Sequence, residues 1–180
     1  MRKLFPIVLL IIYEVAFFCT SVPLADEPTQ SNAAPSHSKK YNFSTDWFTR
    51  DIPIWDKTLQ PLKGQPYLHY LEVGVFEGRS FIWVLENILT HPTCEATAVD
   101  IFPAGLKERF LVNIKQSGSE NKVTVLTGES QIVLRDLPHE SFDIIYIDGS
   151  HRADDVLIDA VLSWRLLKDG GFIIFDDYHW

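Results

Sequence analysis

Acidic residues stand at the end of several short apolar segments of this chain, where a carboxylate is well placed to bind a ligand. They are Glu72, Asp100, Asp148 and the pair Asp176 and Asp177. If the apolar segments are parallel strands, these carboxylates share the edge of the sheet at which ligands bind in open α/β sheets. Acids scattered over a surface would not follow strands so regularly. One carboxylate at that edge can accept the hydroxyls of a ribose, and several together can hold a cation.

A glycine turn follows the first of these acids. Residues 70–80 read YLEVGVFEGRS, which places Glu72, Gly74, Gly78 and Ser80 in the spacing Glu-x-Gly-x-x-x-Gly-x-Ser. Glycines between a strand and a helix let the backbone approach a nucleoside-bearing cofactor closely. The spacing differs from the Gly-x-Gly-x-x-Gly of dinucleotide enzymes. It therefore favours S-adenosylmethionine over NAD, and an NAD-dependent reductase is the poorer alternative.

Two polar residues near this turn have a cofactor role and a simpler alternative. Asp100 follows the next apolar segment, where its carboxylate would accept the ribose hydroxyls; the alternative is that it caps the following helix. Ser80 at the helix start would bind a cofactor carboxylate together with backbone N–H groups. Its alternative is a plain N-cap, and the two roles of Ser80 are compatible.

Asp148, Asp176 and Asp177 form a second group with His151. Adjacent strands would bring the three carboxylates together, which is costly unless a cation balances their charge. Oxygen ligands without cysteine favour Mg²⁺, Ca²⁺ or Mn²⁺ over zinc, and Mg²⁺ is the ion we expect. Such an ion lowers the pKa of a hydroxyl, and His151 would take the hydroxyl proton. The alternative is that Asp148 and Asp177 cap helices and His151 is a surface residue.

The elements that must position these residues alternate along the chain. Short apolar segments typical of strands cover residues 67–73, 95–99, 122–126, 142–147 and 172–175. Apolar residues at helical spacing cover residues 80–89, 104–116, 128–134 and 153–167. This alternation predicts an α/β fold with a doubly wound parallel sheet that is covered on both faces.

The segment before the first strand is rich in aromatic residues. Residues 43–61 include Trp47, Phe48, Ile54 and Trp55. We expect one or two short helices here that pack over the first strand, in preference to an aromatic platform for a substrate.

Composition excludes several classes of protein. The 180 residues are 46% hydrophobic and 22% charged, which allows one globular core. The net charge of −8, without a Lys/Arg cluster, argues against a nucleic-acid partner. Of the two cysteines, Cys19 lies in the apolar N-terminal segment and only Cys94 lies in the rest of the chain, so neither an internal disulfide nor a Cys/His zinc site is expected.

The N-terminus has the pattern of a targeting segment. A basic start at Arg2 and Lys3 precedes an almost wholly apolar run up to Phe18, and Ala25 offers a small residue for cleavage. Residues 1–25 are therefore expected to be a signal peptide, and the alternative is an uncleaved signal anchor that tethers a lumenal domain to the membrane. Residues 26–40 are rich in Pro, Ser and charge and predict a disordered linker. We expect the chain to enter the secretory pathway.

In this order, the segments LEVGVFEGRS, AVDIF, TGESQ, IDGSH and GGFIIFDDY resemble the class I S-adenosylmethionine-dependent methyltransferases. The chain is most similar to the cation-dependent O-methyltransferases, which include catechol O-methyltransferase and the macrocin-type sugar O-methyltransferases. The resemblance implies a Rossmann-like sheet of strand order 3-2-1-4-5 and methyl transfer to a hydroxyl of a small molecule or a sugar. His151 stands where macrocin-type enzymes have a histidine base, which favours an aliphatic or sugar hydroxyl.

The resemblance also implies roles for individual residues. The cofactor pocket would be shaped by Glu72, Gly74 and Gly78, with Ser80 near the methionine carboxylate, Asp100 at the ribose, and Ser130 and Gln131 beside the adenine. The metal ligands would be Asp148, Asp176 and Asp177.

The family sheet usually ends in an antiparallel strand pair, and this sequence stops before it. We therefore expect residues 41–180 to be a C-terminally incomplete methyltransferase domain whose strand at 171–175 is an uncovered edge. A non-catalytic binding module of the same fold, which pairs through that edge as a homo-oligomer or with another protein, is the alternative function.

Overall fold

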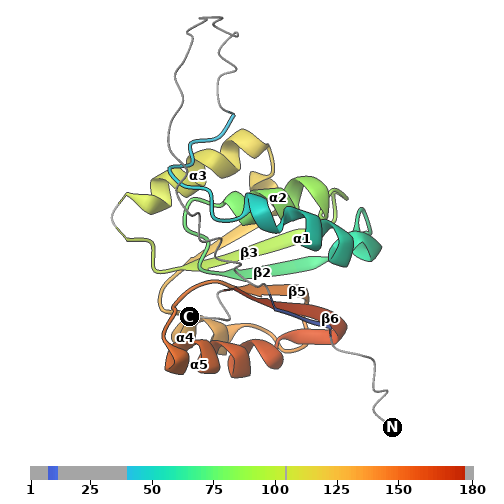
Figure 1. Cartoon of the computed structure of the whole chain (residues 1–180), viewed down its shortest axis with the longest axis vertical. Coiled ribbons are helices and arrows are strands. Elements are labelled where there is room, and N and C mark those ends of the chain that lie inside the picture. The colour runs from blue at the N-terminus through green and yellow to red at the C-terminus, as the bar shows by residue number, and fades with distance from the viewer. Residues whose placement is uncertain (1–7, 12–39, 104, 177–180) are drawn as a thin grey trace, which may run out of the picture.

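Strands that run in the same direction form the centre of the molecule in the computed structural model (Figure 1). The structure describes residues 8–11, 40–103 and 105–176. The sheet has six strands in the order β1-β6-β5-β2-β3-β4, and every neighbouring pair is parallel. The strands are β1 (Val8–Ile11), β2 (His69–Val73), β3 (Glu95–Asp100), β4 (Val123–Thr127), β5 (Phe142–Ile147) and β6 (Leu167–Phe175). Without β1, this is the predicted order 3-2-1-4-5.

Helices cover both faces of the sheet, as predicted. They are α1 (Ile52–Leu59), α2 (Arg79–Asn87), α3 (Leu106–Ser117), α4 (Ser130–Val133) and α5 (Ala153–Trp164), with short 3-10 turns at Thr49–Asp51, Gln60–Leu62, Glu120–Lys122 and Leu134–Asp136. Helices α1, α2 and α3 lie on one face and α4 and α5 on the other (Figure 1).

Alternate residues along the strands pack into two apolar cores, one on each face of the sheet. Tyr70 and Tyr146 belong to the core under α1, α2 and α3, whereas Leu71 and Ile147 belong to the core under α4 and α5. Successive side chains of a strand point to opposite faces, so residues two apart share a face. Strands buried on both faces explain the nearly continuous apolar runs of the sequence.

The fifth predicted strand is longer than expected. The sequence predicted a helix up to residue 167, but α5 ends at Trp164 and β6 already begins at Leu167. Leu167 pairs with Phe142 and Phe172 with Ile144, so an irregularity separates the two paired stretches of β6. The helix prediction overran because Leu167 is buried in the core, and a buried leucine fits either periodicity.

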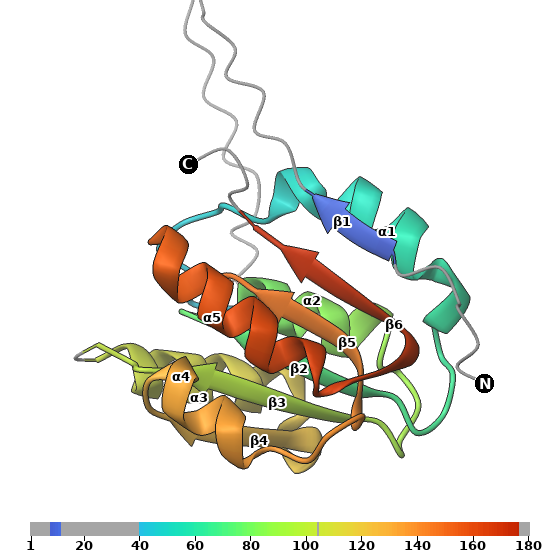
Figure 2. The ribbon, with the colours of Figure 1, turned by 90° about the horizontal axis from the view of Figure 1, so that it is seen from below.

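The outer edge of β6 pairs with β1, where we expected an uncovered edge (Figure 2). The four residues of β1 fall within the segment predicted to be a signal peptide or anchor. The rest of residues 1–25, and residues 26–39 of the predicted linker, lie outside the described residues. Among the helices that the structure describes, none is long and apolar enough to cross a membrane.

Candidate active site

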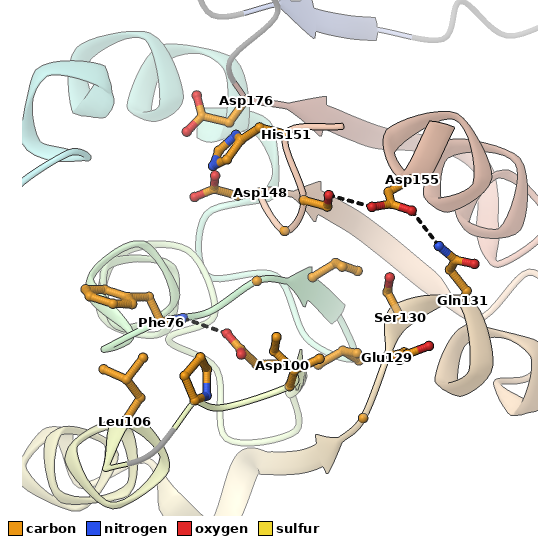
Figure 3. A pocket seen from close by; sticks show the side chains of 18 of the residues that line it. Phe76, Asp100, Leu106, Glu129, Ser130, Gln131, Asp148, His151, Asp155 and Asp176 are labelled. Carbon is orange, nitrogen blue, oxygen red and sulfur yellow. Dashed lines mark hydrogen bonds between the residues drawn. The ribbon is translucent and has the colours of Figure 1, made fainter. Parts of the chain in front are cut away.

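One large cavity opens at the carboxyl ends of the strands (Figure 3). Its volume of about 980 Å³ is at the upper end of the range of roughly 300–1,000 Å³ that is usual for small-molecule pockets. Most of the predicted site residues line it: Gly74, Asp100, Ser130, Gln131, Asp148, His151 and Asp176. The topology therefore gathers residues that lie far apart in the sequence around a single space.

The glycines of the turn are required by close contacts within the protein. At Gly74 φ is +85°, and a Cβ atom would lie 2.1 Å from the carbonyl oxygen of Asp148. At Gly78 φ is +86°, and a Cβ atom would lie 2.8 Å from the ring of Phe110. A side chain at either position would need a strained backbone and movement of a neighbour. These glycines fix the path from β2 to α2, and Gly74 also lines the cavity.

Asp100 closes the end of β3 and points into the cavity (Figure 3). Its Oδ2 accepts the backbone N–H of Phe76 at 3.0 Å, and its Oδ1 accepts that of Phe102 at 2.7 Å. The carboxylate thus links the glycine turn to β3 and is held in one orientation. Each carboxylate oxygen has two lone pairs, so both oxygens keep the capacity to accept a ligand hydroxyl.

Glu72 lies beneath the cavity instead of lining it. Its side chain is fully buried, Oε1 accepts the Ser80 hydroxyl at 2.6 Å, and Oε2 accepts the Tyr70 hydroxyl at 2.5 Å. Burial raises the pKa of Glu72 to about 8, and repulsion from Asp100 and Asp176 adds to this, while the two hydrogen bonds act in the opposite direction. The Ser80 hydroxyl donates its hydrogen bond to Glu72, and Ser80 also lines a second cavity of about 50 Å³.

A polar bridge that the sequence did not reveal closes another wall. Gln131 Nε2 donates to Asp155 Oδ1 at 2.7 Å, and the Ser150 hydroxyl donates to Asp155 Oδ2 at 2.7 Å. Asp155 lies in the first turn of α5, where an acidic residue is already favoured by the helix dipole. The three residues of the bridge come from α4 (Gln131), α5 (Asp155) and the turn after β5 (Ser150), so only the tertiary structure could show it.

The predicted metal ligands follow β5 and β6. The Tyr146 hydroxyl lies 2.8 Å from Asp176 Oδ2 and 3.2 Å from Asp148 Oδ2. Burial raises the pKa of Tyr146 well above its usual range, and repulsion from Asp148 and Asp176 adds to this, so the hydroxyl stays protonated. His151 lies beside both carboxylates, on the side of the cavity away from Asp100 (Figure 3). Asp177 lies outside the described residues.

The donor set matches a hard cation in kind. Asp148 and Asp176 bring carboxylate oxygens to a common neighbour, and oxygen ligands suit Mg²⁺, Ca²⁺ or Mn²⁺. Within the described part of the chain, however, three or more His, Cys, Asp or Glu side chains do not come together in a metal-binding arrangement. The described residues thus supply two of the three predicted ligands.

The aromatic segment before β2 is divided between core and cavity. Phe48 and Trp55 are buried, which confirms core packing for them, but Trp47 is 64% exposed and Ile54 is 40% exposed. Trp47 lines the large cavity and packs against Phe76, with ring centroids 5.4 Å apart and the ring planes tilted by 35°. Core packing was therefore the wrong prediction for Trp47 and Ile54, because exposure depends on tertiary contacts that periodicity does not contain.

Glu77 is a second buried acid of the glycine turn, and its surroundings differ from those of Glu72. The Ser44 N–H and hydroxyl donate to it at 2.6 and 2.7 Å, and Arg109 forms an ion pair with it. Burial alone would raise the pKa of Glu77, but these hydrogen bonds and the Arg109 charge outweigh it and leave the pKa lowered. The chain around Ser44 is thereby fastened to the turn.

Comparison with known proteins agrees with this arrangement. The model of a family described as "Methyltransferase domain" matches residues 71–178, more than half of the chain. The chain is 30% identical over 117 residues to the uncharacterized protein R132 of Acanthamoeba polyphaga mimivirus, covering 62% of this chain and 52% of the relative. It is 31% identical over 111 residues to O-methyltransferase ankF of Aspergillus thermomutatus, covering 59% and 44%. The chain spans about half the length of these curated relatives.

A solved structure shows the same fold. A candidate O-methyltransferase from Klebsiella pneumoniae superposes with a TM-score of 0.61 at 19% identity, covering 73% of this chain and 57% of that chain. At this identity the likeness concerns the fold alone, and it confirms the Rossmann-like α/β arrangement of the five strands β2 to β6.

Proposed function

The chain belongs to the methyltransferase domain family, and we propose that it transfers a methyl group from S-adenosylmethionine to a hydroxyl group of a small molecule or sugar, assisted by a divalent cation such as Mg²⁺. The observation that carries the proposal is the division of the cavity. Asp100 stands on one side, and Asp148, His151 and Asp176 gather on the other (Figure 3). A donor at the first side would present its methyl group toward the second.

The donor side suits a nucleoside. Asp100 has lone pairs for the ribose hydroxyls, and Ile101 lines the cavity although 61% of it is exposed, which offers an apolar surface to a base. Gln131 uses its amide nitrogen on Asp155, so its carbonyl oxygen is left to accept an adenine amino group. Ser80 lines the small cavity near Asp176, and we place the methionine end of the donor there.

The acceptor side suits a hydroxyl group. In the proposed reaction the acceptor oxygen forms a bond to the methyl carbon while the carbon–sulfur bond of the sulfonium breaks, and the hydroxyl proton passes to the His151 imidazole. The products are a methyl ether and S-adenosylhomocysteine. Positioning of the two reactants supplies much of the rate in such a transfer. A cation held by Asp148 and Asp176 would supply a lower pKa at the acceptor hydroxyl.

Donor binding is the first test. Isothermal calorimetry with S-adenosylmethionine should show saturable binding to the full chain, weakened roughly 10-fold or more by Asp100→Ala, because the ribose would lose its acceptor. Glu140→Gln, which alters an exposed acid outside the cavity, is the matched control and should leave the affinity unchanged. A folded protein that binds no donor would exclude a methyltransferase.

Turnover tests the acceptor side. With Mn²⁺ and a panel that includes catechol and free monosaccharides, formation of S-adenosylhomocysteine should fall roughly 10²–10⁴-fold in His151→Gln, while donor affinity is retained. Asp148→Asn should weaken Mn²⁺ binding roughly 100-fold or more, because a neutral amide replaces an ionised ligand. Donor binding without turnover on any acceptor would favour the non-catalytic binding module.

We further propose that residues 1–25 direct the chain into the secretory pathway. The basis is the basic start and apolar run of the sequence. Expression in a secreting eukaryotic cell, followed by N-terminal sequencing, should find a mature chain that begins near Asp26. An intact N-terminus on a protein in the cytosolic fraction would contradict this.

A further inference from the structure

Tyr146 stands directly beneath the two acids of the acceptor side. It is the last but one residue of β5, its side chain is only 2% exposed, and its hydroxyl reaches Asp176 at 2.8 Å and Asp148 at 3.2 Å. The two acids come from the ends of different strands, 28 positions apart in the sequence. The Tyr146 hydroxyl is therefore a physical link between β5 and β6 at the floor of the cavity.

The tyrosine ring is held so that this hydroxyl has a fixed place. The indole of Trp55 packs against it edge to face, with ring centroids 4.7 Å apart and an interplanar angle of 88°. Its backbone neighbours in the sheet are Glu72 on β2 and Ile174 on β6. A ring held this closely in a core has little freedom to change its rotamer, so the hydroxyl keeps its place when the acids move.

The hydroxyl has one proton, and two carboxylates compete for it. The shorter contact identifies Asp176 as its acceptor, and Asp148 lies at the longer distance on the other side of the same oxygen. Two negative carboxylates repel one another, and without a common donor their side chains would separate. A donor buried below them keeps both oriented to the same point above.

We propose that Tyr146 is a positioning residue that holds Asp176 and Asp148 at the separation needed to bind one divalent cation. This inference rests on the proposed cation dependence of the reaction. Tyr146 does not line the large cavity, and where it borders the small one its hydroxyl is directed to the two carboxylates, so it acts through Asp148 and Asp176. Partners of this kind typically change metal affinity roughly 10- to 100-fold when they are removed.

The chain offers a matched control. Tyr70 is also a buried tyrosine whose hydroxyl donates to an acid two residues further along its strand, but that acid is Glu72, which does not line the large cavity. Tyr146→Phe and Tyr70→Phe each remove one hydroxyl and keep the ring. Calorimetric titration of the full-length proteins with Mn²⁺ should show affinity reduced roughly 10- to 100-fold in Tyr146→Phe and unchanged in Tyr70→Phe. Tyr146→Phe should still bind S-adenosylmethionine saturably, which shows that the variant is folded, and its loss of S-adenosylmethionine affinity should be much smaller than its loss of Mn²⁺ affinity.

A second measurement needs no variant. Mn²⁺ binding should redistribute charge on Asp176 and so perturb the tyrosine ultraviolet difference spectrum of the wild-type protein, and this perturbation should persist in Tyr70→Phe. Equal Mn²⁺ affinity in Tyr146→Phe and wild type, or no tyrosine perturbation on Mn²⁺ binding, would overturn the role of Tyr146 and leave the proposed function intact. A wild-type protein that binds S-adenosylmethionine but no Mn²⁺ would overturn the cation dependence and, with it, this inference.

Discussion

Two tyrosine–acid pairs have the same spacing and different surroundings: Tyr70 and Glu72 on β2, and, on the neighbouring strand, Tyr146 of β5 with Asp148 just after the end of that strand. In each, the acid follows the tyrosine by two residues and shares its face of the sheet. Glu72 is fully buried between two hydroxyl donors, whereas Asp148 lines the cavity. One pair belongs to the interior and the other to the candidate site.

Strand register explains the difference. Glu72 is paired with Tyr146, so it lies two positions deeper in the sheet than Asp148 does. The acid of β5 comes just after the strand ends at Ile147, and the acid of β2 comes before the strand ends at Val73. A shift of two residues along the strand thus places Asp148 where it can bind a ligand and Glu72 where it can only stabilise the turn.

The largest effect is expected at Glu72. Its pKa is raised to about 8, so the folded protein binds a proton that the unfolded chain releases above its own pKa of about 4.3. The contribution of Glu72 to stability is therefore fully present below about pH 4 and is lost as the pH rises toward 8. Between pH 5 and pH 9 the wild type should lose roughly 2–4 kcal/mol of unfolding free energy that Glu72→Gln retains.

Urea denaturation at a series of pH values would measure this loss. Glu129→Gln, which changes an exposed acid at the cavity wall, is the control and should keep the pH dependence of the wild type. If Glu72→Gln and wild type lose stability in parallel as the pH rises, Glu72 is not the buried proton-binding group that its surroundings indicate.

Strand ends were predictable from the sequence, and depth in the sheet was not. The alternation of apolar strands and helices was enough to place Asp100, Asp148 and Asp176 at one edge, because parallel strands end on the same side. Glu72 follows the same apolar pattern, but its burial depends on which residue of β5 it faces. The pairing of Glu72 with Tyr146 cannot be deduced from the sequence alone.

Contacts between distant segments were equally hidden. Asp155 accepts hydrogen bonds from Gln131 and Ser150, and Trp47 packs against Phe76 at the cavity although its neighbour Phe48 is buried. The pairing of β1 with β6 joins residues more than 160 positions apart. Local periodicity describes which face of an element is apolar, and it does not describe what that face meets.

Glu77 is about as buried as Glu72, but it has a cation beside it. Its pKa is lowered, so its contribution to stability is present above the pKa of the unfolded chain and is lost as the pH falls through the lower folded value. Arg109→Met should cost roughly 1–2 kcal/mol of unfolding free energy at pH 7, a value that allows for the partly exposed guanidinium. The difference from wild type should shrink as the pH falls through the lowered pKa of Glu77, because the protonated carboxyl group no longer pairs with the guanidinium.

Lys107→Met on the same helix is the matched control for this change. Lys107 donates to the Thr127 hydroxyl at an exposed position, so its loss should cost less than about 0.5 kcal/mol. Urea denaturation at pH 7 and pH 3.5 would compare the two variants. Equal costs for Arg109→Met and Lys107→Met would show that burial of Glu77 does not depend on its cation.

The smallest expected effect is the difference in unfolding free energy between removal of the Tyr70 hydroxyl and removal of the Tyr146 hydroxyl. Tyr70→Phe leaves a fully buried oxygen of Glu72 without one of its donors and should cost about 1–2 kcal/mol at pH 7. Tyr146→Phe should cost less than about 1 kcal/mol, because Asp148 and Asp176 line the cavity and water can replace the lost donor. Urea denaturation measures both. Equal losses would mean that the acids of β5 and β6 are as closed to water as Glu72, and the same two variants would then have to be distinguished by Mn²⁺ affinity alone.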